Sequence, residues 1–100
     1  MTCFETMIDD LYNVILTVDN KNDLKNLFDD LCTDKEIENM ASRLRAAVLL
    51  MNGETYSEII EETGISSTTL SRISKCLRRG SGGYTKVVPS AFPDKFKKED

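Results

Sequence analysis

The segment between Thr55 and Gly80 constrains the fold more than any other part of this sequence. It begins with the capping box Thr55-Tyr56-Ser57-Glu58, in which a hydroxyl and a carboxylate satisfy free backbone amides at the start of a helix. Gly64 comes eight positions after Tyr56, and glycine adopts the left-handed conformation of a tight turn without a steric penalty. Ser66 is a favourable N-cap for a second helix. The pattern predicts helices over residues 56–63 and 67–79, joined by a three-residue turn.

Three further helices are predicted before this segment. Apolar residues recur at steps of three and four between Phe4 and Val18, and again between Leu24 and Leu31, which is the period of amphipathic helices. A second capping box, Thr33-Asp34-Lys35-Glu36, begins a helix that ends at Asn52-Gly53. We therefore expect an all-α fold with a single helical domain over residues 1–80. Residues 81–100 contain Gly and Pro and few apolar side chains, so we predict an extended tail there.

The charged side chains are unevenly distributed, although the formal net charge is −4. Residues 1–42 hold ten acidic and three basic side chains, whereas residues 43–88 hold four acidic and seven basic ones. Between residues 66 and 88 there are five basic side chains and no acidic one. Such asymmetry is typical of a protein with one face that meets nucleic acid phosphates. A solvated helix face explains these charges equally well, so the charge pattern alone does not decide between the two.

Several functional classes are disfavoured by what the sequence lacks. It contains no histidine, which is the commonest general base and metal ligand, so we expect neither an enzyme nor a metal site. Cys3, Cys32 and Cys76 form no C-x-x-C pair, and we interpret them as reduced thiols of an intracellular protein. No apolar run reaches the roughly 18 residues of a membrane span, and the acidic N-terminus differs from a signal peptide. We expect a cytoplasmic protein without a membrane partner.

The second predicted helix of the pair, residues 67–79, has an outward face of hydroxyls and cations. We predict double-stranded DNA as its partner, with the binding residues Ser66, Ser67, Thr68, Ser71, Arg72, Lys75, Arg78 and Arg79. Arginine binds guanine bidentately in the major groove, which makes Arg72 the candidate for base recognition. Arg78 and Arg79 are candidates for phosphate contacts, which carry no sequence information. The alternative is a generic helical hairpin with a polar outer face.

Residues 33–77 resemble the Trp repressor superfamily, and within it the YerC/YecD-type branch of small Trp-repressor-related proteins. The resemblance is carried by Thr33-Asp34-Lys35-Glu36-Ile37, Arg43-Leu44-Arg45, Leu49-Leu50-Met51-Asn52-Gly53, Tyr56-Ser57-Glu58-Ile59 and Thr69-Leu70-Ser71-Arg72-Ile73. It implies five to six helices in an interlocked homodimer, with dimerising helices over residues 1–31, a core helix over 33–52 and a helix-turn-helix over 55–79. It also implies a repressor that reads a palindromic operator, because a two-fold dimer presents two reading helices about one DNA turn, roughly 34 Å, apart.

The resemblance further implies a candidate ligand pocket, because the Trp repressor binds L-tryptophan between two arginines and near threonines. The matching positions, two arginines and two threonines, are Arg43, Arg72, Thr33 and Thr69. Two departures argue against tryptophan in this chain. Ile73 stands where the repressor has a glycine, and Cys76 stands where it has a serine. Because the isoleucine side chain fills space that the ligand would need, we expect no tryptophan site and no other cofactor.

Two other functions compete with that of a DNA-binding regulator. The first is a protein–protein docking module, since parts of sigma factors share the Gly-turn-Ser pattern, and an acidic N-terminal half suits such a role. The second is a metabolite-sensing regulator whose ligand is not tryptophan, and only the Arg43 and Arg72 pair motivates it. Binding to one palindromic DNA without any protein partner would separate the regulator from the docking module.

Overall fold

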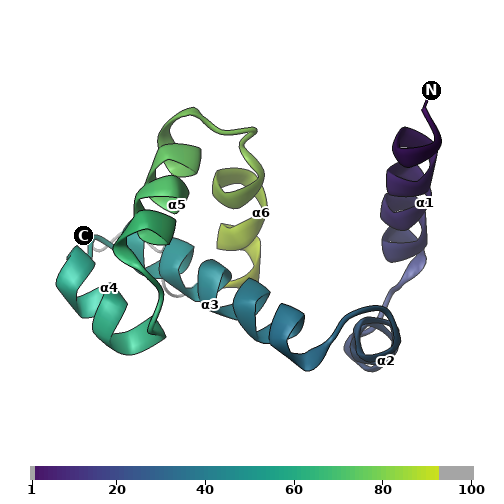
Figure 1. The fold of residues 1–100 in the computed structure, drawn as a ribbon, viewed down its shortest axis with the longest axis horizontal. Helices are drawn as coiled ribbons and strands as arrows, with labels where there is room; N and C mark the ends of the chain where they lie inside the picture. Colours follow the sequence, from purple (N-terminus) through teal and green to yellow (C-terminus); the bar gives the residue numbers. More distant parts are fainter. Residues whose placement is uncertain (1, 93–100) are drawn as a thin grey trace. The chain divides into compact units, whose positions relative to one another are not determined.

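The computed structural model describes residues 2–92 and contains six α-helices within that range (Figure 1). They are α1 (Cys3–Thr17), α2 (Lys21–Leu31), α3 (Asp34–Met51), α4 (Tyr56–Thr63), α5 (Ser67–Arg79) and α6 (Gly83–Ala91). The chain divides into two compact units, Met1–Ile37 and Glu38–Asp100. The predicted all-α fold class is confirmed. A single domain over residues 1–80 stays a prediction.

Side-chain caps explain where the helices begin. Thr55 and Glu58 form the predicted capping box of α4, in which the Glu58 amide donates to the Thr55 hydroxyl over 3.2 Å. A capping box of Thr2 and Glu5 begins α1, and it was not predicted from the sequence. The caps of α2 and α5 are the predicted Asn20 and Ser66. A cap of this kind contributes about 1 kcal/mol to helix stability, so these short motifs determine the helix starts locally.

The predicted capping box at the start of α3 is also present. The Thr33 amide donates to Glu36 Oε1 over 2.8 Å, and the Glu36 amide donates to Thr33 Oγ1 over 3.1 Å. The hydrogen bonds from the Thr33 backbone and hydroxyl stabilise the carboxylate and lower the pKa of Glu36. Because the ionised form is the bonded one, this cap is present above the ordinary pKa of a glutamate and is lost as the pH falls through the lowered value.

The first unit has apolar surface but no buried core. No residue of α1 or α2 is buried. The large apolar side chains of α1, with exposed fractions between 37% and 81%, are Phe4, Met7, Ile8, Leu11, Tyr12, Val14 and Leu16. Amphipathic helices of this length gain most of their stability from packing the apolar face. The first unit therefore needs a surface that covers this face.

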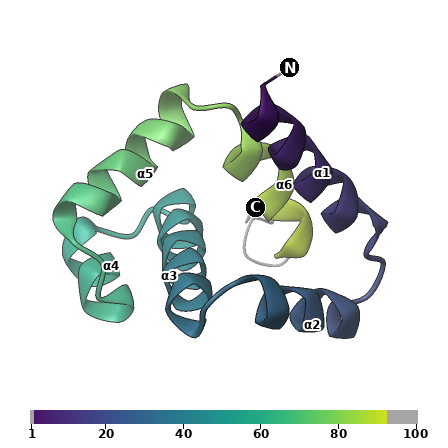
Figure 2. The same cartoon turned by 45° about the vertical axis from the view of Figure 1, so that its right-hand side comes forward.

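The second unit has a hydrophobic core of its own, built where α3, α4 and α5 meet (Figure 2). Its buried residues are Ala46, Ala47, Leu49, Ile59, Leu70 and Ile73. The two alanines on α3 carry only a methyl group each, so the other helices approach this part of α3 closely. Partly buried side chains surround this core, among them Ile60 on α4 and Tyr84 on α6. The core fixes the orientation of α5, because two of its residues, Leu70 and Ile73, belong to it.

The prediction of an extended tail over residues 81–100 is wrong for residues 83–91, which form α6. Gly82, at φ +86°, reverses the chain direction after α5, and a new helix begins at the next residue. Tyr84 then packs against the core, and Val88 is buried. This burial outweighs the cost of Pro89 inside the helix, which lacks an amide hydrogen. Residues 93–100, including Pro93, lie outside the described residues.

Two predictions about surface and covalent chemistry can be compared with residues 2–92. No helix in this range combines the length and the apolar character that crossing a bilayer requires. Cys3, Cys32 and Cys76 form no disulfide there. No three acidic, cysteine or histidine side chains within the range are grouped as metal ligands.

Candidate nucleic-acid interface

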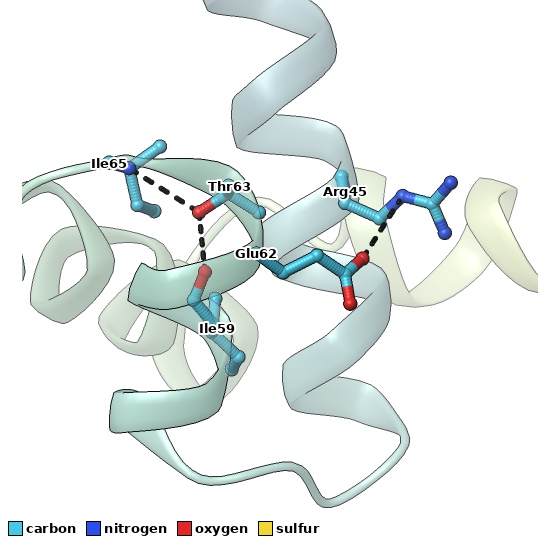
Figure 3. Close-up of polar contacts among 5 residues, drawn as sticks. All are labelled: Arg45, Ile59, Glu62, Thr63 and Ile65. Carbon is cyan, nitrogen blue, oxygen red and sulfur yellow. Dashed lines mark hydrogen bonds and ion pairs between the residues drawn. The ribbon is translucent and has the colours of Figure 1, made fainter.

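The turn between α4 and α5 has the geometry that the sequence predicted. Gly64 has φ +73°, in the left-handed region, and its amide donates to the carbonyl of Ile60 over 2.9 Å. The Thr63 hydroxyl donates to the Ile59 carbonyl over 2.7 Å and accepts from the Ile65 amide over 3.4 Å (Figure 3). A polar residue directly before the glycine therefore satisfies backbone groups on both sides of the turn, which makes the turn rigid.

An ion pair joins α3 to α4 on the surface of the second unit. Arg45 Nε lies 3.8 Å from Glu62 Oε2, and both side chains are about half exposed (Figure 3). A pair with this exposure contributes little to stability, on the order of 0–1 kcal/mol. The pairing has a second consequence, because Glu62 was one of the acids considered as a partner for Arg43. Arg43 has no ion pair within residues 2–92.

The two faces of α5 differ sharply. Leu70 is fully buried and Ile73 is 3% exposed, so both face the core. Every predicted DNA-binding residue is exposed: Ser66, Ser67, Thr68, Ser71, Arg72, Lys75, Arg78 and Arg79. No acidic side chain lies on α5. The core therefore orients α5 so that its hydroxyls and cations face away from the rest of the second unit.

Two of these eight side chains already have partners. Ser66 accepts from the Thr69 amide over 3.1 Å, and its hydroxyl donates to Thr69 Oγ1 over 2.9 Å, so it serves mainly as the N-cap. Arg78 Nη1 donates to Ser74 Oγ over 3.2 Å, which holds its guanidinium along the helix. The other six form no side-chain hydrogen bond or ion pair with residues 2–92, and they are Ser67, Thr68, Ser71, Arg72, Lys75 and Arg79.

A cavity of about 520 Å³ lies beside α5 in the second unit. Its lining residues are Arg43, Thr68, Thr69, Arg72, Ile73, Cys76 and Tyr84. Three of the four predicted pocket residues line it, whereas Thr33 belongs to the first unit, and its place at the pocket stays a prediction. Tyr84 was missed because the segment that holds it was predicted to be extended. The helical spacing of Tyr84, Val87 and Val88 was the available signal.

The described geometry is that of a helix-turn-helix whose second helix exposes a basic face. The chain matches the family model described as Trp repressor protein over residues 6–91. The chain belongs to the Trp repressor family. The match extends well beyond residues 33–77, where the sequence resemblance lies, and includes most of α1 and all of α2 and α6.

Known relatives support this assignment. The chain is 43% identical over 77 residues to YerC, an uncharacterised protein of Bacillus subtilis (strain 168), which covers 77% of this chain and 74% of that protein. A crystal structure of a candidate Trp repressor from Staphylococcus aureus has a TM-score of 0.79 and 33% identity, covering 93% of this chain and 96% of that one. A TrpR-like protein from Eubacterium eligens ATCC 27750 has a TM-score of 0.83 and 30% identity, covering 92% and 94%.

These similarities place the chain among the YerC-type members of the family. The Trp repressor family consists of helix-turn-helix regulators of DNA and not of enzymes, so the sequence-based prediction of a regulator agrees with the family. α4 and α5 are the helix-turn-helix, and α5 is its second helix.

Proposed function

We propose that this protein is a transcriptional repressor that binds a palindromic operator and inserts α5 into the major groove. One observation carries the proposal. The core residues Leu70 and Ile73 hold α5 so that its acid-free outer face, with Arg72 and Lys75 at the centre, is exposed. A helix that presents hydroxyls and cations in this way can contact base edges and phosphates together.

The side chains of α5 divide into two groups by their availability. Arg72 and Lys75 are exposed and unpaired within residues 2–92, so both can reach base edges. Arg72 can bind guanine bidentately, as the sequence suggested. Arg78 lies at the end of the helix and is held by Ser74, a position that suits a phosphate contact. The same division gives sequence selectivity to the centre of α5 and affinity to its C-terminal end.

A homodimer is part of the proposal, and the apolar surfaces of both units support it. α1 exposes an apolar face for which the first unit offers no core. The second unit also exposes Met40, Leu44 and Val87, and Leu44 lines a cavity of about 270 Å³ with Ala41, Arg45, Val48 and Phe92. A second copy of this chain covers such faces symmetrically and supplies a second reading helix for the other half of a palindrome.

Disrupting the face of α1 tests the dimer. Ile8→Asp places a charge in the exposed apolar face, and we expect sedimentation velocity to show the mass of one chain where the unchanged protein shows two. Asn13→Asp adds the same charge to an exposed α1 position away from the apolar stripe, and should leave the dimer intact. A single-chain mass for the unchanged protein would contradict the dimer, and so would an Ile8→Asp protein that remains dimeric.

Repression requires only occupancy of the operator, because a bound dimer blocks other proteins sterically. We propose the cytoplasm as its place of action, since bacterial DNA is found there. The docking-module alternative has support only from the acidic first unit. A requirement for RNA polymerase before any DNA binding is seen would favour that alternative.

Selection from random duplex DNA with the full chain tests the proposed function. We expect a palindromic consensus whose half-sites are about one helical turn apart. The gel-shift affinity for this duplex should exceed that for a scrambled duplex of the same composition. If three or four basic side chains per protomer contact phosphates, log affinity should fall against log salt with a slope of about −5 to −7. Enrichment of no duplex, or of sites without two-fold symmetry, would refute the proposal.

A second candidate function, a small-molecule sensor, is favoured by the cavity beside α5. Arg43 of α3 and Arg72 and Thr68 of α5 line the same cavity, and the last two also belong to the proposed DNA-binding face. A ligand held there would touch the side chains that contact DNA, and would therefore change operator affinity. Tryptophan stays excluded in this proposal, because Ile73 occupies the cavity wall while belonging to the core.

A further inference from the structure

We propose that the cavity beside α5 and a second cavity next to it form one site for a small organic acid with an apolar body. The inference rests on the sensor function proposed above and gives the chemical class of its ligand. The second cavity measures about 320 Å³ and lies where α5 passes into α6. Its lining residues are Cys76, Ser81, Gly82, Gly83 and Tyr84.

The two cavities adjoin each other. Cys76 on α5 and Tyr84 on α6 line both of them, so these two side chains stand between the two spaces. Tyr84 is only partly buried, and it is attached to a helix whose first residues follow a Gly-Gly pair. Pockets for small ligands usually measure about 300–1,000 Å³, and each cavity falls within this range. A ligand longer than either space would extend from one cavity into the other past Tyr84.

The first cavity has the chemistry of an anion site. Arg43 and Arg72 place two guanidinium groups on its walls, and neither has an acidic partner within residues 2–92. The Thr69 hydroxyl accepts a hydrogen bond from Ser66, so its own hydrogen is free to donate. Two unneutralised cations and a free hydroxyl donor on one cavity favour a carboxylate, which arginine can bind bidentately.

The second cavity has a different chemistry. A tyrosine ring, a cysteine side chain and glycine backbone surround it, and no charged side chain lines it. Burial of an alkyl or aryl group there is favourable by about 0.8 kcal/mol for each methylene removed from water. The carboxylate of the ligand would therefore lie between the arginines, and its apolar body would lie against Tyr84 and the glycines. This arrangement selects an aryl- or alkyl-substituted acid over a short acid.

Calorimetric titration of the full chain tests this site with three matched probes: phenylbutyrate, acetate and phenylbutanol. We expect saturable binding of phenylbutyrate, with acetate and phenylbutanol each weaker by about tenfold or more, because each lacks one half of the ligand. Arg43→Gln should weaken phenylbutyrate about tenfold through the lost charge. Gly83→Leu should do the same by filling the second cavity, since a Cβ at Gly83 has no atom within 4 Å.

The control is Ser90→Leu, which adds the same side chain to an exposed position of α6 that lines neither cavity. It should leave phenylbutyrate affinity unchanged, and circular dichroism should show all three variants folded. Absence of saturable phenylbutyrate binding would overturn the inference. So would a Gly83→Leu protein with unchanged affinity, or tighter binding of L-tryptophan than of phenylbutyrate. Operator binding by the ligand-free protein is measured separately, so failure of the DNA-binding proposal is distinguishable from failure of this site.

Discussion

The Leu70→Asp variant should lose the structure of the second unit. Leu70 is fully buried in the core that joins α3, α4 and α5. Removing its side chain alone costs about 2–5 kcal/mol, and burying an unpaired carboxylate adds several more. A small domain has a total stability of about 5–15 kcal/mol, so the change removes most or all of it. We expect a large loss of helical circular dichroism at 25 °C, and no cooperative thermal transition for this unit.

Ser71→Asp is the matched control for this prediction. It introduces the same charge one position further along α5, at an exposed site. The protein should remain folded, while its affinity for DNA should fall because a carboxylate then faces the phosphates. A well-folded Leu70→Asp protein would show that the inward and outward faces of α5 are assigned wrongly.

Arg72→Ala should weaken operator binding strongly without unfolding the protein. Arg72 is exposed and makes no ion pair within residues 2–92, so its removal leaves the core unchanged. A bidentate contact from arginine to guanine contributes about 1–3 kcal/mol of discrimination. A dimer has two such contacts, so the expected loss is about 2–6 kcal/mol at the full palindrome. Affinities for the operator and for duplexes substituted at each guanine would measure it.

The accompanying change in selectivity identifies the role of Arg72. If Arg72 reads a base, the substituted duplexes should become nearly equivalent for the variant. If Arg72 binds only a phosphate, all duplexes should weaken alike and the salt slope should fall by about 1 per lost contact. Lys86→Ala removes one exposed cation from α6 and serves as the charge control. An Arg72→Ala protein with unchanged affinity would mean that another residue recognises the operator.

The helix starts and the turn were predictable because their causes are local. Thr55 with Glu58, Asn20 and Ser66 cap helices through hydrogen bonds to residues three positions away. Gly64 adopts its positive φ within the same short stretch. These interactions need no distant part of the chain, so the residue types and spacings were sufficient evidence. The exposed face of α5 followed from the same periodicity, since Leu70 and Ile73 determine which side is inward.

The errors came from contacts between segments far apart in the sequence. α6 was predicted as an extended tail because Gly82, Gly83 and Pro89 disfavour a helix locally. The burial of Val88 and the packing of Tyr84 against the core overcome that preference. The partner of Glu62 also depended on distance in space, and proved to be Arg45 on α3.

The sequence by itself determined where five of the helices lie, where α4 turns into α5, and which side chains α5 exposes, because caps, glycine turns and apolar periodicity act over a few residues. Only the tertiary structure decided that α6 forms and that Tyr84 joins Arg43 and Arg72 around one cavity. Those features depend on burying apolar surface between distant segments, and that free energy is not contained in any local pattern.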